Sequence, residues 1–159
     1  MGSMRLKPIT LKAANEFVKE HHRHSKPTIG HKYSIGVVDD IEGIIGVAIV
    51  GRPVGRGYDD GYTAEVLRVC TAPSAEKNIC SMLYAGAWRS WKGMGGDRII
   101  TYTLEREKGI SVQSAGWLKG PTIQPKSKPW KGPDRDRVEQ KVFLEPKIRW
   151  EINTRANSV

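Results

Sequence analysis

Four histidines fall within eleven positions, in the segment HHRHSKPTIGH that spans residues 21–31, and the chain has no others. Histidine exchanges a proton readily near neutral pH and is also the commonest metal ligand. No cysteine stands close by, and exposed histidines in a basic loop are common, so a pocket-lining role is favoured over a metal site and we assign no metal ligands. His21, His24 and His31 are the candidates for that role, and an exposed basic loop is the alternative.

Glu65 stands at the head of a strand-like run, EVLRVCT, which covers residues 65–71. A carboxylate whose pKa is raised by burial can take a proton from an attacking amine, directly or through water. Glu65 is therefore a candidate general base. In the alternative reading it forms an ion pair with Arg68 or Arg52.

The C-terminal segment interleaves basic residues with tryptophans, and Trp130 stands between Lys128 and Lys131. This pattern suits phosphate neutralisation with a stacking platform for a flipped or single-stranded base. The alternative is a solvated tail whose tryptophans pack on the core. The formal net charge of +9, from 26 Lys and Arg against 17 Asp and Glu, favours either a polyanion such as DNA or a small anionic ligand.

A strand, a turn and a helix position Glu65 and the residues that follow it. The pattern predicts a strand over 62–71, a helix over 78–92 and a strand over 98–104, so the two strands should run parallel through a right-handed crossover. The helix start offers free backbone N–H groups and the positive end of the helix dipole, which suit an anion. Asn78 and Ser81 at this start either cap the helix or contact the ligand.

The remaining pattern is mixed α/β with no internal repeat. We predict a strand over 5–10, a helix over 11–22 capped by Thr10, and a hairpin of the strands 33–38 and 44–50 around the turn 39–43. Further along the chain we predict a loop over 51–61, a short helix over 111–115, a loop over 121–137 and a last strand within 141–151. The 159 residues fit one domain, with a core over 4–120 and a basic, proline-rich extension over 121–159 that packs on it or completes it.

Neither a membrane segment nor a signal peptide is recognised in the sequence. No apolar run approaches the ~20 residues that cross a bilayer. The only cysteines are Cys70 and Cys80, which does not indicate a disulfide framework. We therefore expect a cytoplasmic protein with reduced thiols and no membrane partner.

The order of elements, together with the motif SVQSAGW at 111–117, resembles the GNAT acyltransferase superfamily over residues 5–120. The resemblance implies a mixed, mostly antiparallel sheet with a central parallel β-α-β crossover and flanking helices. It also implies an N-acyltransferase that uses acetyl-CoA or a related acyl donor. In that family glycines after the fourth strand hold the coenzyme A pyrophosphate, whereas Asn78 and Cys80 occupy those positions here. Val112 replaces a common general-acid tyrosine, which leaves Tyr84 or Tyr102 as the proton donor.

A narrower resemblance rests on HHRHSKP, EVLRVCT and KNICSMLYAGAW, which are similar to small phage and prophage GNAT proteins and, through them, to the Mom proteins that modify adenine in phage DNA. Asn78 and Ser81 match the Asn-x-x-Ser of Mom-type sequences. The implied acceptor is the exocyclic amine of a DNA base. The alternatives are an acetyl-CoA-dependent N-acetyltransferase of a small amine or protein, and a non-catalytic phage binding protein. The oligomeric state stays open, and a dimer is possible.

Residue chemistry and resemblance together give three sets of candidates. Proton transfer is assigned to Glu65, Tyr102 and His24. Contacts to the acyl donor are assigned to Val69, Cys70, Thr71, Asn78, Ser81 and Ser111. Contacts to the acceptor are assigned to His21, His31, Tyr33, Arg52 and Trp130.

Overall fold

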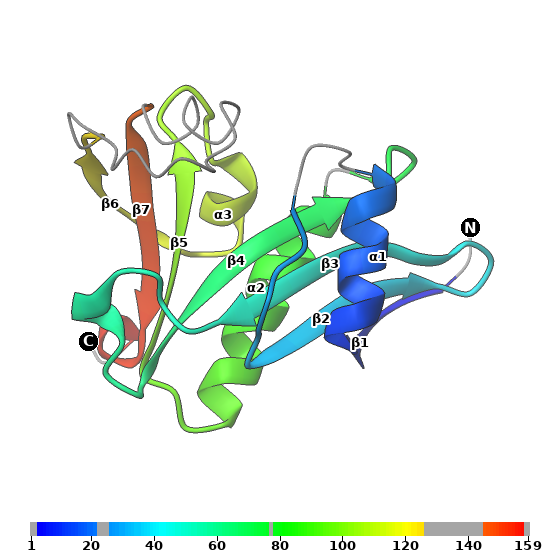
Figure 1. Ribbon diagram of the computed structural model, residues 1–159, viewed down its shortest axis with the longest axis horizontal. Helices are drawn as coiled ribbons and strands as arrows, with labels where there is room; N and C mark the ends of the chain where they lie inside the picture. Colours follow the sequence, from blue (N-terminus) through cyan, green and yellow to red (C-terminus); the bar gives the residue numbers. More distant parts are fainter. Residues whose placement is uncertain (1–2, 22–25, 77, 126–144, 158–159) are drawn as a thin grey trace, which may run out of the picture.

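Seven strands form one twisted sheet with helices on both faces (Figure 1). The computed structural model describes residues 3–21, 26–76, 78–125 and 145–157. The strand order is β1-β2-β3-β4-β5-β7-β6, and in the described chain every neighbouring pair is antiparallel except β4 and β5, which are parallel. The fold predicted from the sequence, a mixed and mostly antiparallel sheet with a central parallel crossover, is confirmed.

Most of the predicted elements are present, with ends shifted by one or two residues. The strands are β1 (Met4–Ile9), β2 (Tyr33–Asp39), β3 (Gly43–Gly51), β4 (Thr63–Thr71), β5 (Arg98–Leu104), β6 (Leu118–Ile123) and β7 (Lys147–Asn153). The α-helices are α1 (Leu11–His21), α2 (Asn78–Gly93) and α3 (Ile110–Ser114), and the 3-10 helices are η1 (Arg56–Tyr58) and η2 (Thr154–Asn157).

Local side-chain chemistry sets the first turns of the fold. The backbone N–H of Ala13 donates to Thr10 Oγ1 at 3.1 Å, so Thr10 caps α1 as predicted. In the turn between β2 and β3, the Asp39 carboxylate accepts from the N–H groups of Ile41 and Glu42 at 2.7 and 3.1 Å. These contacts fix where α1 begins and where the β2–β3 hairpin closes.

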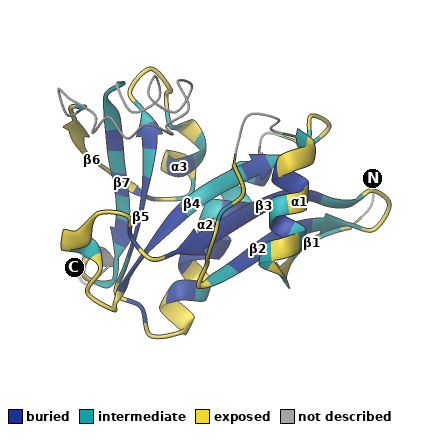
Figure 2. Ribbon diagram, in the orientation of Figure 1, coloured by how far each residue is buried: buried dark blue, intermediate teal, exposed yellow. Residues whose placement is uncertain are grey.

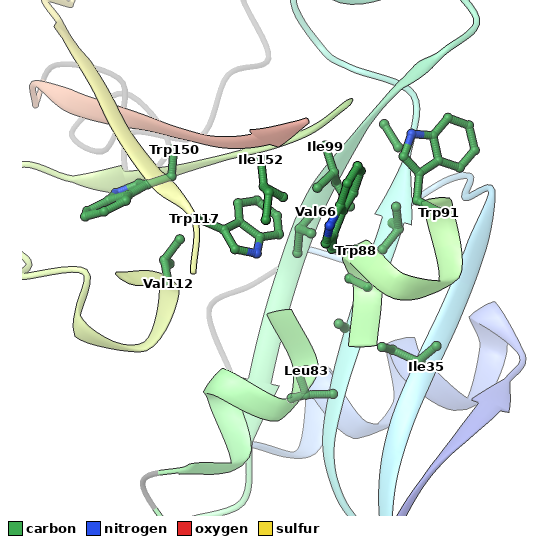
Figure 3. Packing of buried hydrophobic residues seen from close by; sticks show 14 of the residues in the cluster. Ile35, Val66, Leu83, Trp88, Trp91, Ile99, Val112, Trp117, Trp150 and Ile152 are labelled. Atoms are coloured by element: carbon green, nitrogen blue, oxygen red, sulfur yellow. The ribbon is translucent and has the colours of Figure 1, made fainter. Parts of the chain in front are cut away.

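The core lies on both faces of the sheet. The α2 face holds the larger cluster, which includes four of the five tryptophans of the chain: Trp88, Trp91, Trp117 and Trp150 (Figure 3). The α1 face holds a smaller cluster made of Ala14, Phe17, Val18, Val47, Ile49 and Cys70. Alternate residues of β3 enter the two clusters, which makes β3 a strand buried on both faces.

The C-terminal part departs from the prediction. Residues 121–123, which were expected in a loop, belong to β6, an edge strand that pairs with β7. The pairing shifts register between Lys119 and Thr122, and this irregularity accommodates Pro121, which cannot donate a ladder hydrogen bond. The last strand, predicted within 141–151, is β7; residues 141–144 lie outside the described part. None of the described helices has both the length and the apolar character needed to cross a bilayer.

Candidate active site

The parallel strands β4 and β5 pair over only three residues and then separate. Thr63, Ala64 and Glu65 pair with Arg98, Ile99 and Ile100, and beyond them the described chain pairs β4 only with β3 and β5 only with β7. Figure 1 shows the two strands diverging, with α3 at the wide end. We call the space between their diverging edges the β4–β5 split.

A β-bulge accounts for the divergence. Val66 pairs with Val50 and Arg68 with Ile49, which leaves Leu67 as an extra residue on β4. A bulge bends its strand and increases the local twist, and here it carries β4 away from β5. The edge of β4 that faces the split thus has no strand partner in the described chain, so its backbone groups can pair with an extended ligand as they would with another strand.

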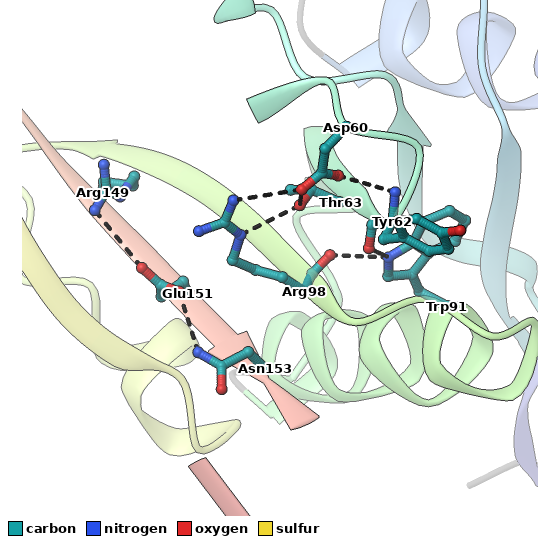
Figure 4. Close-up of polar contacts among 8 residues, drawn as sticks. All are labelled: Asp60, Tyr62, Thr63, Trp91, Arg98, Arg149, Glu151 and Asn153. Carbon is teal, nitrogen blue, oxygen red and sulfur yellow. Dashed lines mark hydrogen bonds and ion pairs between the residues drawn. The ribbon is translucent and has the colours of Figure 1, made fainter. Parts of the chain in front are cut away.

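The narrow end of the split is locked by polar contacts (Figure 4). Arg98 Nε donates to Thr63 Oγ1 at 3.2 Å, and the Arg98 guanidinium lies 3.9 Å from the Asp60 carboxylate. The indole N–H of Trp91 donates to the carbonyl oxygens of Arg98 and Tyr62, at 2.8 and 3.1 Å. These bonds hold the first residues of β4 and β5 together, so the opening begins at a fixed point.

Glu65 stands at that point. Its side chain is buried, with 7% of the residue exposed, and Oε1 accepts a hydrogen bond from the N–H of Val54 at 3.1 Å. Burial raises the pKa of Glu65, and the Val54 N–H and the positive charge of Lys147 oppose that shift. Arg52 pairs with Asp59 instead, at 2.7 Å. Glu65 therefore has the environment of a general base.

Tyr102 lies on the same face of the sheet as Glu65. Glu65 pairs with Ile100, and Tyr102 follows two residues later, so the two side chains project to the α1 side. Burial and the negative charge of Glu65 raise the pKa of Tyr102, while Arg98 opposes the shift. The phenol thus stays protonated at neutral pH and is available as a proton donor.

The opposite, α2 face of the split is lined by Trp117 and Tyr84. Their rings make an edge contact with centroids 5.5 Å apart, and Figure 3 shows Trp117 between Val112 of α3 and Val66 of β4. Burial raises the pKa of Tyr84 to about 12. Trp117 Nε1 is buried and has no hydrogen-bond partner. Since buried N–H groups are almost always paired, this donor is free to bond an acceptor atom beside the split.

A hydrogen bond from a side chain connects the start of α2 to α3. Ser81 Oγ donates to the carbonyl oxygen of Ser111 at 3.2 Å. Asn78, the first residue of α2, is exposed, and Cys80 is a half-buried free thiol. The turn before them is closed by the N–H of Ala75, which donates to the carbonyl oxygen of Ala72 at 2.9 Å. The helix start therefore lies open at the end of β4, where the sequence predicted an anion site.

Solved structures share this arrangement over almost the whole chain. A Bacillus subtilis acetyltransferase in complex with CoA has a TM-score of 0.66 at 11% identity, covering 95% of this chain and 99% of the other. The fold is that of the GNAT acetyltransferases. An IAA acetyltransferase from Bacillus cereus gives a TM-score of 0.67 at 16% identity, with 95% and 99% covered.

An acetyltransferase with a named protein acceptor also shares the GNAT fold. The ribosomal-protein-S18-alanine N-acetyltransferase of Escherichia coli has a TM-score of 0.64 at 11% identity, with 95% of this chain and 94% of the other covered. No family model and no curated protein matches the sequence itself. The likeness is thus one of fold, and the chemistry has to be argued from the residues.

On the GNAT fold, the predicted donor residues divide between the two faces of the sheet. Val69 packs against the α2-face cluster, and the methyl carbon of Thr71 lies on the same face beside Gly46. Cys70 is buried in the α1-face cluster, and burial raises the pKa of its thiol to about 11. Only the backbone of Cys70 is thus placed to meet a donor on the α2 face. Donor binding by these residues stays a prediction.

The predicted acceptor residues are not brought together. Tyr33 projects to the α2 face, where its hydroxyl donates to the carbonyl oxygen of Ala87 at 2.6 Å, and burial raises its pKa. The His21 ring packs on Phe17 with centroids 4.3 Å apart, and His31 Nδ1 lies 2.8 Å from Ser34 Oγ. Their acceptor roles stay predictions. Two further candidates lie outside the described residues: His24 and Trp130.

Two residues on the face of Glu65 and Tyr102 were not singled out as site residues from the sequence. Arg149 pairs with Tyr102 across β5 and β7, and its guanidinium lies 4.9 Å from the centre of the Tyr58 ring. Arg68 lies beyond the bulge, on the α1 face of β4. Strand alternation alone places Arg149 beside Tyr102, so it could have been found once β5 and β7 were paired. Arg68 could not have been found in this way, because the bulge changes the strand alternation before it.

The described part of the molecule offers no better place for this chemistry. A cavity of about 390 Å³ lies on the α2 face, and its lining includes Leu6, Pro8, Tyr33, Gly86, Ser90 and Met94 but not Glu65. Within the described residues, no three His, Cys, Asp or Glu side chains gather closely enough to hold a metal ion. The split between β4 and β5, with Glu65 at its narrow end, remains the candidate active site.

Proposed function

We propose that the protein is an N-acyltransferase that takes its acyl group from acetyl-CoA or a related acyl-CoA. One observation carries the proposal: a buried carboxylate, Glu65, stands where the unpaired edge of β4 begins. The acetyltransferase of Bacillus subtilis with the same fold binds CoA, which supports this donor. Bound acyl-CoA would supply a thioester that is open to attack by an amine.

The residues around the split fit such a donor. The chain that carries the thioester contains amide groups, and these can pair with the free edge of β4 over residues 69–71. The buried N–H of Trp117 needs an acceptor atom, and an amide or thioester oxygen would satisfy it. The open start of α2 at Asn78 suits a phosphate group, since N–H groups and the helix dipole both favour an anion there.

Glu65 and Tyr102 then handle the protons. The Glu65 carboxylate takes the proton of the acceptor amine at Oε2, since Oε1 already accepts from Val54. The raised pKa of Tyr102 keeps its hydroxyl protonated, so it can give a proton to the thiolate that leaves the thioester in the split. Both groups lie on the α1 face, so we place the acceptor there.

The acceptor is an amine, and we retain the exocyclic amine of a DNA base as one candidate. The net charge of +9 supports a polyanionic partner. Nucleoside analysis of DNA from cells that express the wild-type chain is expected to show a modified base that is missing with Glu65→Gln. Unmodified DNA, together with acetylation of small amines in vitro, would assign the protein to small acceptors.

Calorimetry and a thiol-release assay test the proposal itself. Wild-type protein is expected to bind CoA and to release the thiol from acetyl-CoA in the presence of an amine pool. Glu65→Gln should bind CoA equally well and lose about 10²- to 10⁴-fold in kcat, because only the proton acceptor is removed. Glu105→Gln, at an exposed position beyond β5, is the matched control. Absence of CoA binding, or full activity of Glu65→Gln, would favour a non-catalytic binding protein.

A further inference from the structure

Two arginines beside the candidate active site have buried nitrogen atoms without partners. Arg68 Nε and Arg149 Nε are shielded from solvent, and neither has a hydrogen-bond partner. A buried donor carries a desolvation cost that a bound partner removes. Both side chains belong to the α1 face of the sheet, the face of Glu65 and Tyr102. Two such atoms on one face indicate a ligand that accepts hydrogen bonds there.

Arg149 is held in place by an ion pair that leaves its Nε without a partner. Its terminal nitrogen lies 3.6 Å from the Glu151 carboxylate, which is longer than a hydrogen bond, and Glu151 also accepts from Asn153 at 3.2 Å (Figure 4). The Tyr58 ring, 4.9 Å from the guanidinium, fixes its plane. Arg149 therefore offers an oriented Nε–H beside its strand neighbour Tyr102.

Arg68 is half-buried on β4, three residues after Glu65. Its strand neighbour is Ile49 of the α1-face cluster, and within the described residues no hydrogen bond or ion pair to its guanidinium is found. The titratable groups that share this face with Arg68 and Arg149 are Glu65, Tyr102, Lys147 and Glu151, and the pKa values of Glu65 and Tyr102 are both raised. Cationic groups outnumber carboxylates on this face near the split.

We propose that the acceptor is an amine that carries its own oxyanion, a carboxylate or a phosphate, which Arg68 and Arg149 bind while the amine lies at Glu65. A planar guanidinium pairs with carboxylate or phosphate oxygens in a fixed geometry. This inference rests on the acyl transfer proposed above and names its substrate class.

Matched pairs of amines test it. Acetyl-CoA is offered with an equimolar mixture of ethanolamine and phosphoethanolamine, phenethylamine and phenylalanine, and deoxyadenosine and its 5′-monophosphate, and products are quantified by mass spectrometry. At least one anion-bearing member is expected to exceed its neutral partner by about ten- to hundredfold in kcat/KM. The winning pair tells whether the oxyanion is a carboxylate or a phosphate, and whether the amine is that of a nucleotide.

Variants then assign the preference to the two arginines. Arg149→Met and Arg68→Met should each lower kcat/KM for the anion-bearing amine by about tenfold or more, and by more than for its neutral partner, while Arg149→Lys, which keeps the charge, recovers part of the loss. Arg5→Met, on the exposed edge strand β1, is the matched control. Thermal unfolding confirms that each variant is folded.

The outcomes separate this inference from the proposed function. Acetylation of the neutral members at least as fast as of the charged ones overturns the oxyanion site and leaves the acyltransferase standing. If no amine is acetylated, the acyltransferase fails in this range, and the site is judged by calorimetric binding of inorganic phosphate. Phosphate binding that is lost in Arg149→Met and kept in Arg5→Met supports the site, and equal or absent binding overturns it.

Discussion

The two halves of the sheet differ on the face that carries α1. In the half formed by β1 to β4, α1 covers β2, β3 and β4, and seven consecutive residues of β3 are buried. In the half formed by β5, β7 and β6, β7 alternates between buried and half-buried residues, and β6 is exposed over most of its length (Figure 2). The first half therefore carries a helix on this face, whereas the second half is covered there by the loop that contains Tyr58, whose ring lies over Arg98 and Arg149.

This difference separates stability from chemistry. Strands buried on both faces must be apolar throughout, whereas a strand covered on one face can present charged residues on the other. Here the half without a helix on this face carries the half-buried Tyr102 and Arg149, and Glu65 stands where the two halves meet. Substitutions in the half covered by α1, the covered half, should act on folding, and those at Glu65, Tyr102 and Arg149 should act on ligands.

The largest effect is expected from Ile49→Asp. Ile49 is fully buried between β3 and α1, and an unpaired carboxylate there should cost about 4 kcal/mol or more, enough to leave the protein largely unfolded. Circular dichroism during thermal unfolding measures the loss. Ile41→Asp, at a position that is 78% exposed, is the control and should shift Tm little. Equal stability of the two variants would contradict the role given to the covered half.

A moderate effect is expected from Gly46→Val in β3. A Cβ at Gly46 would lie 2.9 Å from Ile79 and 3.1 Å from Leu83, so the added side chain would push α2 off the sheet at a cost of about 1–3 kcal/mol. Gly57→Val, in the 3-10 helix η1 at a position where a Cβ meets nothing within 4 Å, is the control. Denaturant unfolding that showed no difference would argue against close packing of α2 on β3.

The smallest effect on stability is expected from Glu65→Gln. Burial raises the pKa of Glu65, so the folded state binds its proton more tightly than the unfolded state, and stability falls as pH rises through the folded-state pKa. At pH 7 the variant should be as stable as the wild type or slightly more so, and each kcal/mol of added stability would raise Tm by about 2–4 °C.

That gain should vanish below the ordinary glutamate pKa of about 4.3, where both states are protonated. Thermal unfolding across this pH range measures it. A marked fall in Tm at neutral pH would show that Glu65 holds the fold together and is not set aside for chemistry.

The sequence allowed the elements from β1 to β5 to be predicted, because their apolar periodicities are regular and their ends carry Thr10, Asp39 and Gly-rich turns. It did not allow β6 to be predicted. Leu118 and Ile123 are exposed edge residues separated by Lys119, Gly120 and Pro121, so no alternation remains to be read.

For the site, the sequence placed Glu65 at the head of β4 but did not show which side chains share its face. Tyr33, predicted as an acceptor residue, lies on the α2 face, where its hydroxyl donates to the carbonyl oxygen of Ala87, and its acceptor role stays a prediction. Arg68 shares the face of Glu65 although three residues separate them, because the bulge at Leu67 shifts the alternation. A bulge leaves no mark in a single sequence, so such neighbours emerge only from the strand register.

Amide hydrogen exchange with and without CoA tests the central claim most directly, namely that the β4–β5 split holds the acyl donor. Saturating CoA is predicted to slow exchange along β4 beyond Glu65 and at the start of α2, and to leave β2 and the cavity beside Tyr33 unchanged. Slower exchange around that cavity, or no change along β4, would contradict the account.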